Sequence, residues 1–374
     1  MNEERTYRPE WAPKEQTADF ATAYVKGKED TTLRSQETKK WVKRKERSVS
    51  EYVEGVLNND RTILAQAITL VESNAAKHME RAQQILHELL PHVGRSIRIG
   101  ITGVPGAGKS TFIEAFGQFL CEQGHRVAVL AVDPSSSITG GSILGDKTRM
   151  ENLARDPRAF IRPSPSGGTL GGVHRKTRET MLLCEAAGYD IILIETVGVG
   201  QSEFVVRSMV DFFMMIALTG AGDELQGMKK GIMELVDAVV INKADGDNKP
   251  KAEAAREEYN QFLHYLRPAT PGWETKAYTC SALLGEGIEK VWNVVEAFIS
   301  VTKQSGAFDA RRRHQLKDWI YSMIKDYLES SFFSHPQIKA ELPMIENHVI
   351  AGTLSVTKAV QQLLQIYETK KGSE

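Results

Sequence analysis

The sequence predicts an α/β protein with a mostly parallel β-sheet, flanked by N-terminal and C-terminal helical extensions. From residue 97 onward, short aliphatic runs alternate with helical stretches. Strands that are apolar along their whole length are typical of a parallel sheet that is covered on both faces. Before and after this region, apolar residues recur at steps of three and four, which is the spacing of amphipathic helices.

Four regions follow from these patterns. Residues 1–45 form a polar arm, and residues 46–95 form a helical region in which the apolar spacing between 61 and 90 predicts a pair of amphipathic helices. The core spans residues 96–304, and a C-terminal helical arm spans 305–374. The runs that predict strands in the core are 97–103, 126–133, 159–164, 189–196, 212–220, 238–245 and 276–283.

The C-terminal arm carries an apolar stripe with two interpretations. One is that the stripe packs on the protein's own core, and the other is that it pairs with a second subunit. Spacing alone favours neither. The stripe consists of Leu316, Trp319, Ile320, Met323, Ile324, Tyr327 and Leu328.

Composition limits which partners and which cellular compartment we expect. The formal net charge of −1 argues against nucleic acid or an anionic membrane surface as a partner reached through bulk attraction. The three cysteines, Cys121, Cys184 and Cys280, form no C-x-x-C pair and are expected to be thiols in a reducing compartment. The N-terminus has no signal-peptide or transit pattern, and no run approaches the ~18–20 apolar residues of a membrane span. We therefore expect a cytoplasmic protein.

The first chemical motif is "GVPGAGKST", residues 103–111. It matches G-x-x-x-x-G-K-[ST] and lies between a predicted strand and a predicted helix, so it predicts a phosphate-binding P-loop and places the core among the P-loop NTPases. Lys109 is expected to reach the β- and γ-phosphates, and Ser110 to bind Mg²⁺. The residues expected to contact nucleotide are Gly103, Val104, Pro105, Gly106, Ala107, Gly108, Lys109, Ser110 and Thr111.

The second motif indicates which base is bound. Asn242, Lys243 and Asp245 fit N-K-x-D at the end of a predicted strand. The Asp245 carboxylate can accept hydrogen bonds from guanine N1–H and its exocyclic amino group, whereas adenine offers no such pair. In the later "TCSAL", a backbone amide near guanine O6 is expected from Cys280, Ser281 and Ala282. These motifs favour GTP and GDP over ATP.

Acidic residues of the core predict a magnesium site. Asp133 ends a predicted strand, Asp146 lies beyond a Gly/Ser-rich loop, and Glu195 ends another strand. With Ser110 they make an oxygen-only environment of the kind Mg²⁺ prefers. Asp133 could instead open a turn and Asp146 could cap a helix. Spacing favours the metal role for Asp133 and Glu195 and leaves Asp146 open.

Two further segments resemble nucleotide switches. "ETVGVGQSE", residues 195–203, has Glu195 where many GTPases have the Asp of Asp-x-x-Gly, and Gly198 is expected to sense the γ-phosphate. Val199 stands where Ras-like proteins carry a water-orienting glutamine, so we expect slow intrinsic hydrolysis. In "TGAGDELQGMKKGI", residues 219–232, Lys229 either faces water or belongs to a segment that changes shape with the nucleotide.

Together, "TGVPGAGKST", "VDPSSSITGGSILGDKTRM", "ETVGVGQSE", "TGAGDELQGMKKGI" and "NKAD" resemble the MeaB/ArgK family. This family contains GTPase chaperones of adenosylcobalamin-dependent acyl-CoA mutases and includes the human MMAA protein. The resemblance extends from about Leu57 to the C-terminal helices. It implies a P-loop GTPase core with a C-terminal arm that forms a homodimer, which favours the second-subunit interpretation of the stripe.

The resemblance also implies residue roles and a partner. Family Mg²⁺-binding and catalytic positions match Ser110, Asp133, Asp146 and Glu195, and Lys229 matches a lysine of a third switch loop that responds to the partner. With Lys109 of the P-loop these are the candidate catalytic residues. The implied partner is methylmalonyl-CoA mutase or a related mutase, whose cofactor loading and protection the GTPase assists.

Two other functions compete with this interpretation. A metal-insertion GTPase of the hydrogenase or urease type shares the core, but those proteins usually carry a His-rich tract or Cys/His ligands, and here the nine histidines are scattered. An ATP-using kinase linked to amino-acid transport is disfavoured by the guanine-reading Asp245.

Overall fold

The computed structural model describes residues 47–132, 150–163, 170–196, 202–220 and 230–368. Within them, a seven-stranded sheet has the order β3-β2-β4-β1-β5-β6-β7, and every pairing between its strands is parallel. The predicted α/β class is therefore confirmed. The strands are β1 (Ile97–Gly103), β2 (Val127–Val132), β3 (Ala159–Arg162), β4 (Ile191–Thr196), β5 (Phe212–Ala217), β6 (Ala238–Ile241) and β7 (Lys276–Thr279).

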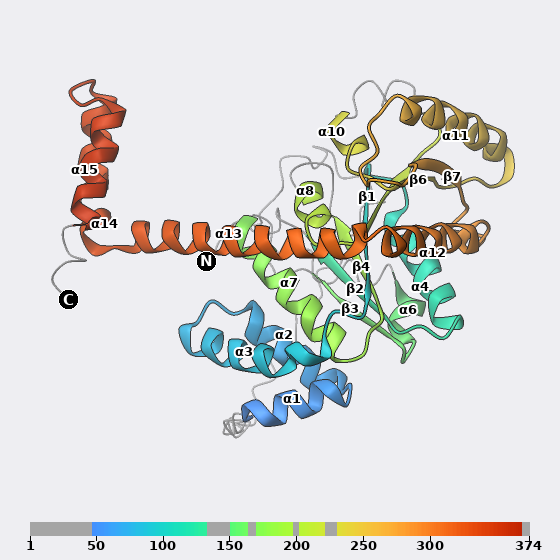
Figure 1. Ribbon diagram of the computed structural model, residues 1–374, viewed down its shortest axis with the longest axis horizontal. Helices are drawn as coiled ribbons and strands as arrows, with labels where there is room; N and C mark the ends of the chain where they lie inside the picture. The colour runs from blue at the N-terminus through green and yellow to red at the C-terminus, as the bar shows by residue number, and fades with distance from the viewer. Residues whose placement is uncertain (1–46, 133–149, 164–169, 197–201, 221–229, 369–374) are drawn as a thin grey trace, which may run out of the picture. The chain divides into compact units, whose positions relative to one another are not determined.

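The strands are largely apolar, as expected when both faces of the sheet are covered (Figure 1). Alternate side chains of a strand point to opposite faces, so Val127 and Val129 of β2 join one apolar cluster while Ala128 and Leu130 join the other. The first cluster includes helices α4 (Lys109–Glu122) and α12 (Ile288–Gln304).

The second cluster contains the N-terminal helices and those that follow the central strands. The predicted pair of amphipathic helices corresponds to α2 and α3, and Asp60 caps α2 by accepting hydrogen bonds from the amides of Thr62 and Ile63. The helices on this face are α1 (Val49–Leu57), α2 (Arg61–Glu72), α3 (Ala76–Leu89), α7 (Leu170–Ala186), α8 (Ser202–Arg207), α10 (Lys230–Met233) and α11 (Lys249–His264). Short connecting elements are η1 (Leu90–His92), α6 (Glu151–Arg155) and η2 (Gly246–Asn248).

Three further helices complete the described chain: α13 (Ala307–Ser334), α14 (Pro336–Ile350) and α15 (Val356–Glu368). The α14–α15 hairpin packs around a small apolar cluster of its own, formed by Ile338, Ile345, Ala359 and Leu363. In α13 only Phe308 and Gln315 are buried.

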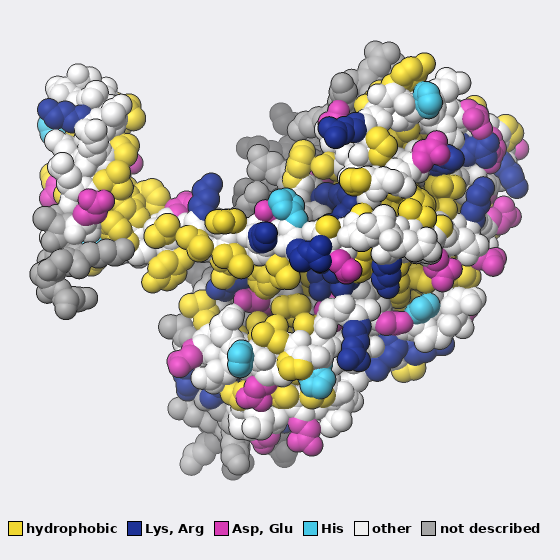
Figure 2. All heavy atoms as spheres, in the orientation of Figure 1, with side chains coloured by type: hydrophobic (Ala, Val, Ile, Leu, Met, Phe, Trp, Pro, Cys, Tyr) yellow, Lys and Arg dark blue, Asp and Glu magenta, His cyan; other side chains and the backbone are white. Residues whose placement is uncertain are grey.

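Much of the apolar stripe of α13 is not covered by the protein's own core, although Trp319 packs against Arg178 of α7. Leu316, Ile320 and Ile324 are 55%, 58% and 50% exposed, and Figure 2 shows hydrophobic side chains gathered along this helix. Such a surface is unusual for a helix that serves only its own fold. No helix in the described part of the chain combines the length and apolarity needed to cross a membrane.

Candidate nucleotide site

The phosphate loop connects the end of β1 at Gly103 to the start of α4 at Lys109, as the motif predicts. A Cβ on Gly103 would lie 2.2 Å from the carbonyl oxygen of Ile216 in β5, so the strand end tolerates only glycine. Gly108 has a left-handed φ of 83°, and a Cβ there would lie 2.7 Å from Asn242 Nδ2. The loop thus brings backbone N–H groups and the positive end of α4 to one place, an arrangement that suits an anion.

Lys109 lies over this loop. Its Nζ donates to the carbonyl oxygens of Gly103 at 2.8 Å and Val104 at 3.4 Å. Burial lowers the pKa of Lys109, while the nearby carboxylates of Glu195 and Glu203 act in the opposite direction. The ammonium group is therefore held beside the loop in a partly desolvated setting, where attraction to phosphate oxygens is strong.

Two of the predicted magnesium ligands meet at this loop. Glu195 is buried near the end of β4, in register with Ile101 of β1 and Ala131 of β2, and the Ser110 hydroxyl donates to its Oε1 at 3.2 Å. Both are hard oxygen donors, which fits Mg²⁺. The other residues predicted to bind the metal or respond to the phosphates lie outside the described residues: Asp133, Asp146, Gly198 and Lys229.

Glu203 is a residue of this site that the sequence reasoning did not single out. It is fully buried in the first turn of α8 and interacts electrostatically with Lys109. A second acid eight residues after Glu195, next to an apolar helix that packs into the core, was the signal that could have found it. It makes the surroundings of Lys109 more acidic than the motif alone suggests.

The N-K-x-D motif meets the phosphate loop through Asn242. Its Nδ2 donates to the carbonyl of Ala107 at 2.9 Å, and its Oδ1 accepts from the amide of Ala282 at 3.0 Å. The Cys280 thiol lies 3.6 Å from the same oxygen. One buried amide therefore joins three segments that are far apart in the sequence, and it brings the predicted base-contacting residues 280–282 beside the phosphate loop.

Asp245 lies beside the same 280–282 segment. Its Oδ2 accepts from the Ser281 hydroxyl at 2.5 Å, and the preceding Ala244 amide donates to the carbonyl of Cys280 at 3.0 Å. These bonds fix the carboxylate against that segment while leaving it partly exposed. A purine base at this position would find an oriented acceptor pair, as guanine requires.

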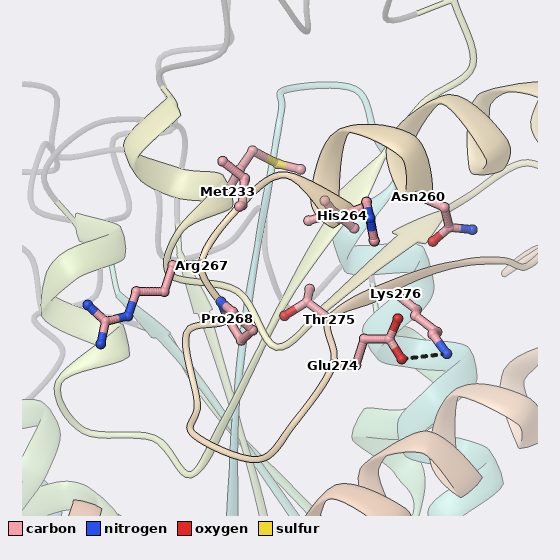
Figure 3. Close-up of a pocket in the computed structure, with 10 residues that line it drawn as sticks. Met233, Asn260, His264, Arg267, Pro268, Glu274, Thr275 and Lys276 are labelled. Carbon is pink, nitrogen blue, oxygen red and sulfur yellow. Dashed lines mark ion pairs between the residues drawn. The ribbon is translucent and has the colours of Figure 1, made fainter.

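A separate cavity of about 410 Å³ lies between α10, α11 and β7. In Figure 3, Arg267 points away from the other labelled side chains, and Glu274 pairs with Lys276 at 2.8 Å. None of the residues predicted to contact nucleotide lines it. Its charges are partly neutralised among themselves, so the convergent polar groups of a nucleotide site are found at the P-loop and not here.

Comparison with known proteins agrees with this geometry. The family model described as methylmalonyl Co-A mutase-associated GTPase MeaB matches residues 64–337. The chain belongs to the MeaB family of GTPases. The match begins in α2 and ends at the start of α14, so it contains every strand of the sheet and all of α13.

Individual MeaB-family relatives extend over most of the chain. A putative GTPase of Caulobacter vibrioides is 54% identical over 308 residues, which is 82% of this chain and 94% of that protein. The mouse protein described as methylmalonic aciduria type A homolog, mitochondrial, is 46% identical over 87% of this chain and 81% of its own length. A crystal structure of an LAO/AO transport system kinase has a TM-score of 0.69 and 39% identity, covering 86% of this chain and 98% of that one.

Proposed function

We propose that this GTPase is a chaperone for an adenosylcobalamin-dependent acyl-CoA mutase of the methylmalonyl-CoA mutase type, which it assists in assembly, cofactor loading and protection. The observation that carries the proposal is the match over residues 64–337 to a family described by its association with that mutase. We place the activity in the cytoplasm, because the three free cysteines are buried thiols, as a reducing compartment allows.

Nucleotide chemistry in this proposal belongs to the loops around α4. Residues 103–111 would hold the phosphates, and Asn242, Lys243 and Asp245 with residues 280–282 would hold guanine. A Mg²⁺ ion, held by Ser110 and Glu195 with Asp133 and Asp146, would supply positive charge to the β- and γ-phosphates. The close approach of the Ser110 hydroxyl and the Glu195 carboxylate supports this assignment. Gly198 and Lys229 would report the state of the nucleotide to the partner.

The α13 stripe is proposed as the contact between two copies of the chain. It is apolar, half or more exposed along much of its length, and lies within the arm that spans 305–374. A second copy presents the same stripe, so the contact would be self-complementary, as in two-fold dimers. The unit for client binding would then be a homodimer in which each 96–304 core carries one nucleotide.

The decisive experiment measures binding of the purified GTPase to purified methylmalonyl-CoA mutase by biolayer interferometry, with GDP or a non-hydrolysable GTP analogue present. We expect a dissociation constant that differs between the two nucleotides by about tenfold or more, roughly 1.4 kcal/mol of coupling. We also expect GTP hydrolysis to accelerate when the mutase is added. Absence of binding with both nucleotides would refute the chaperone proposal and leave the GTPase assignment intact.

A kinase function is the second candidate, because the structural relative with a TM-score of 0.69 is described as a transport system kinase. The two functions differ in the base they require. The arrangement of Asp245 and Ser281 favours guanine. Competition between ATP and GTP for the labelled-nucleotide site separates them: we expect GTP to bind more tightly, and tighter ATP binding would support the kinase.

A further inference from the structure

We propose that Asn248 is a positioning residue for guanine recognition, holding Lys243 and Asp245 in their base-reading arrangement and connecting them to the end of β5. This inference rests on the assignment of guanine to the N-K-x-D motif. Asn248 is outside that motif and makes no contact with the phosphate loop among the bonds that the structure describes.

The feature that needs explaining is the backbone of Lys243. Its φ is 62°, in the left-handed region, and among the described non-glycine residues only Asn59 shares a positive φ. Left-handed backbone is unfavourable for lysine because Cβ approaches the following carbonyl oxygen, and lysine lacks the short polar side chain that makes asparagine tolerant. Something outside the residue must therefore hold this conformation.

Asn248 supplies that restraint. Its Nδ2 donates to the carbonyl oxygen of Lys243 at 2.7 Å, and its own backbone amide donates to the carbonyl of Asp245 at 3.0 Å. The side-chain nitrogen must face Lys243, because a backbone carbonyl can only accept. Both hydrogen bonds are therefore made to residues assigned to the base: Lys243, whose side chain would lie along the base plane, and Asp245, which would accept from it.

The oxygen of the Asn248 side-chain amide also makes a hydrogen bond. Asn248 Oδ1 accepts from the Thr219 hydroxyl at 3.0 Å, and Thr219 lies just after β5, the strand whose Ile216 carbonyl packs against Gly103. Asn248 is also the N-cap residue of α11, where asparagine commonly accepts from the first helical amides, yet it makes no side-chain cap bond there. Its side chain instead donates to Lys243 of the N-K-x-D motif.

An amide is the group that this position requires. Aspartate could still accept from Thr219 but could not donate to the carbonyl of Lys243, and two oxygens would then face each other. Without the donor, residue 243 relaxes towards the right-handed region and Asp245 loses its alignment with the base. Affinity for GDP and GTP should fall together, because both nucleotides present the same guanine.

The test compares Asn248→Asp, and Asn248→Ala as an uncharged second variant, with Thr219→Ser as the matched control that keeps the hydroxyl. Fluorescent GDP and GTP titrations give the dissociation constants, and thermal unfolding establishes that each variant is folded. We expect Asn248→Asp to weaken both nucleotides about tenfold, as expected for one lost hydrogen bond with an added repulsion. We expect Thr219→Ser to bind normally.

Two readouts separate positioning from a general structural role. First, the ratio of inosine to guanosine diphosphate dissociation constants should fall in both Asn248 variants, because inosine lacks the amino group that a well-placed Asp245 recognises. Second, the loss caused by Asn248→Ala should shrink to less than about threefold in a Lys243→Gly background, since glycine adopts the left-handed conformation without strain.

An unchanged inosine-to-guanosine ratio would overturn the proposal, and so would an equal loss with and without the Lys243→Gly change. Failure of the guanine assignment is recognised separately, by an Asp245→Asn variant that keeps its preference for guanine over xanthine nucleotides. That result would refute the assignment of guanine to the N-K-x-D motif, whereas the two readouts above test the role of Asn248 itself.

Discussion

At the scale of single residues, the segment proposed to read the base is held in place by a few polar contacts of Asn242 and Asp245. Asp245 accepts from Ser281, and Asn242 holds Ala107 and Ala282 on either side. A change of one functional group in this segment is therefore expected to alter its contacts with the proposed base.

Asp245→Asn is expected to exchange base preference. The amide donates where guanine also donates, so guanine nucleotides should weaken on the order of 100-fold, while xanthine, which carries an oxygen at C2, should gain. Competition titrations with GDP and xanthosine diphosphate measure both effects. Asp247→Asn removes the same charge at an exposed position just beyond the base motif, so it is the control and should change neither constant.

The cysteine beside this segment gives a pH-dependent prediction. Burial raises the pKa of Cys280 to about 12 and that of Cys121 to about 11, and it also raises the pKa of Cys184. Because the thiolate is the reactive form, native protein near pH 8 should react slowly with a disulfide reagent, and the rate should rise with pH towards these values. In denatured protein all three thiols are exposed and should react together. Rapid native reaction of any thiol would contradict the buried placement.

Motifs indicate candidate residues of this site only where spacing along the chain is informative. Asn242, Asp245 and the phosphate loop follow fixed patterns, so the sequence indicated them directly. Asn248 and Glu203 follow none: each matters because folding places it beside Lys243 or Lys109. Such roles depend on backbone conformation and burial, which a single sequence does not encode as a pattern.

At the scale of elements, α13 is fixed to the sheet by two buried aspartates that precede strands. Arg312 donates to both carboxylate oxygens of Asp211, at 2.8 and 2.6 Å, just before β5. Asp237, just before β6, lies 3.1 Å from Arg207 of α8 and 3.6 Å from Arg311. Burial lowers the pKa of Arg311, with Asp237 opposing it. Burial acts in the same direction on Arg312, but its bonds with Asp211 raise the pKa of that guanidinium overall.

Replacing Arg312 by methionine should be costly. The change keeps much of the side-chain volume but leaves the Asp211 carboxylate buried without its partner, which costs about 3–5 kcal/mol when a buried pair is broken. Urea-induced unfolding near pH 7 gives the free energy directly. Arg313→Met, at the exposed neighbouring position, is the matched control and should lie within about 0.5 kcal/mol of the parent.

The positions of most helices and strands could be predicted from the sequence, but the contacts between them could not. Uninterrupted apolar runs predicted the parallel strands, although the run at 159–164 ends as a strand at Arg162, before Pro163, and the run at 276–283 ends at Thr279. The pairing of Arg312 with Asp211 joins residues about a hundred positions apart. Strand order and such long-range pairs arise from packing, which local spacing does not specify.

At the scale of the whole molecule, the α13 stripe connects the GTPase to its proposed second copy. We expect the Leu316→Glu, Ile320→Glu double variant to weaken self-association at least about tenfold, because it places charge in an apolar contact. Light scattering after size-exclusion chromatography would then show the mass of one chain at concentrations where the parent shows two. Lys317→Glu, an exposed neighbour outside the stripe, should leave the mass unchanged. A parent of single-chain mass would contradict the dimer.

The attachment of α13 also determines where the chain can be divided. A fragment that stops at Gln304 leaves the buried Asp211 carboxylate without its Arg312 partner, whereas Asp237 keeps Arg207. It also removes Gln315, which donates to the Val210 carbonyl at 2.8 Å. A fragment that continues through Ser322 retains Arg312 and Gln315 and lacks only the end of α13 and the hairpin. The first turns of α13 are therefore part of the folded core, and the turns beyond them are the ones available for the proposed association.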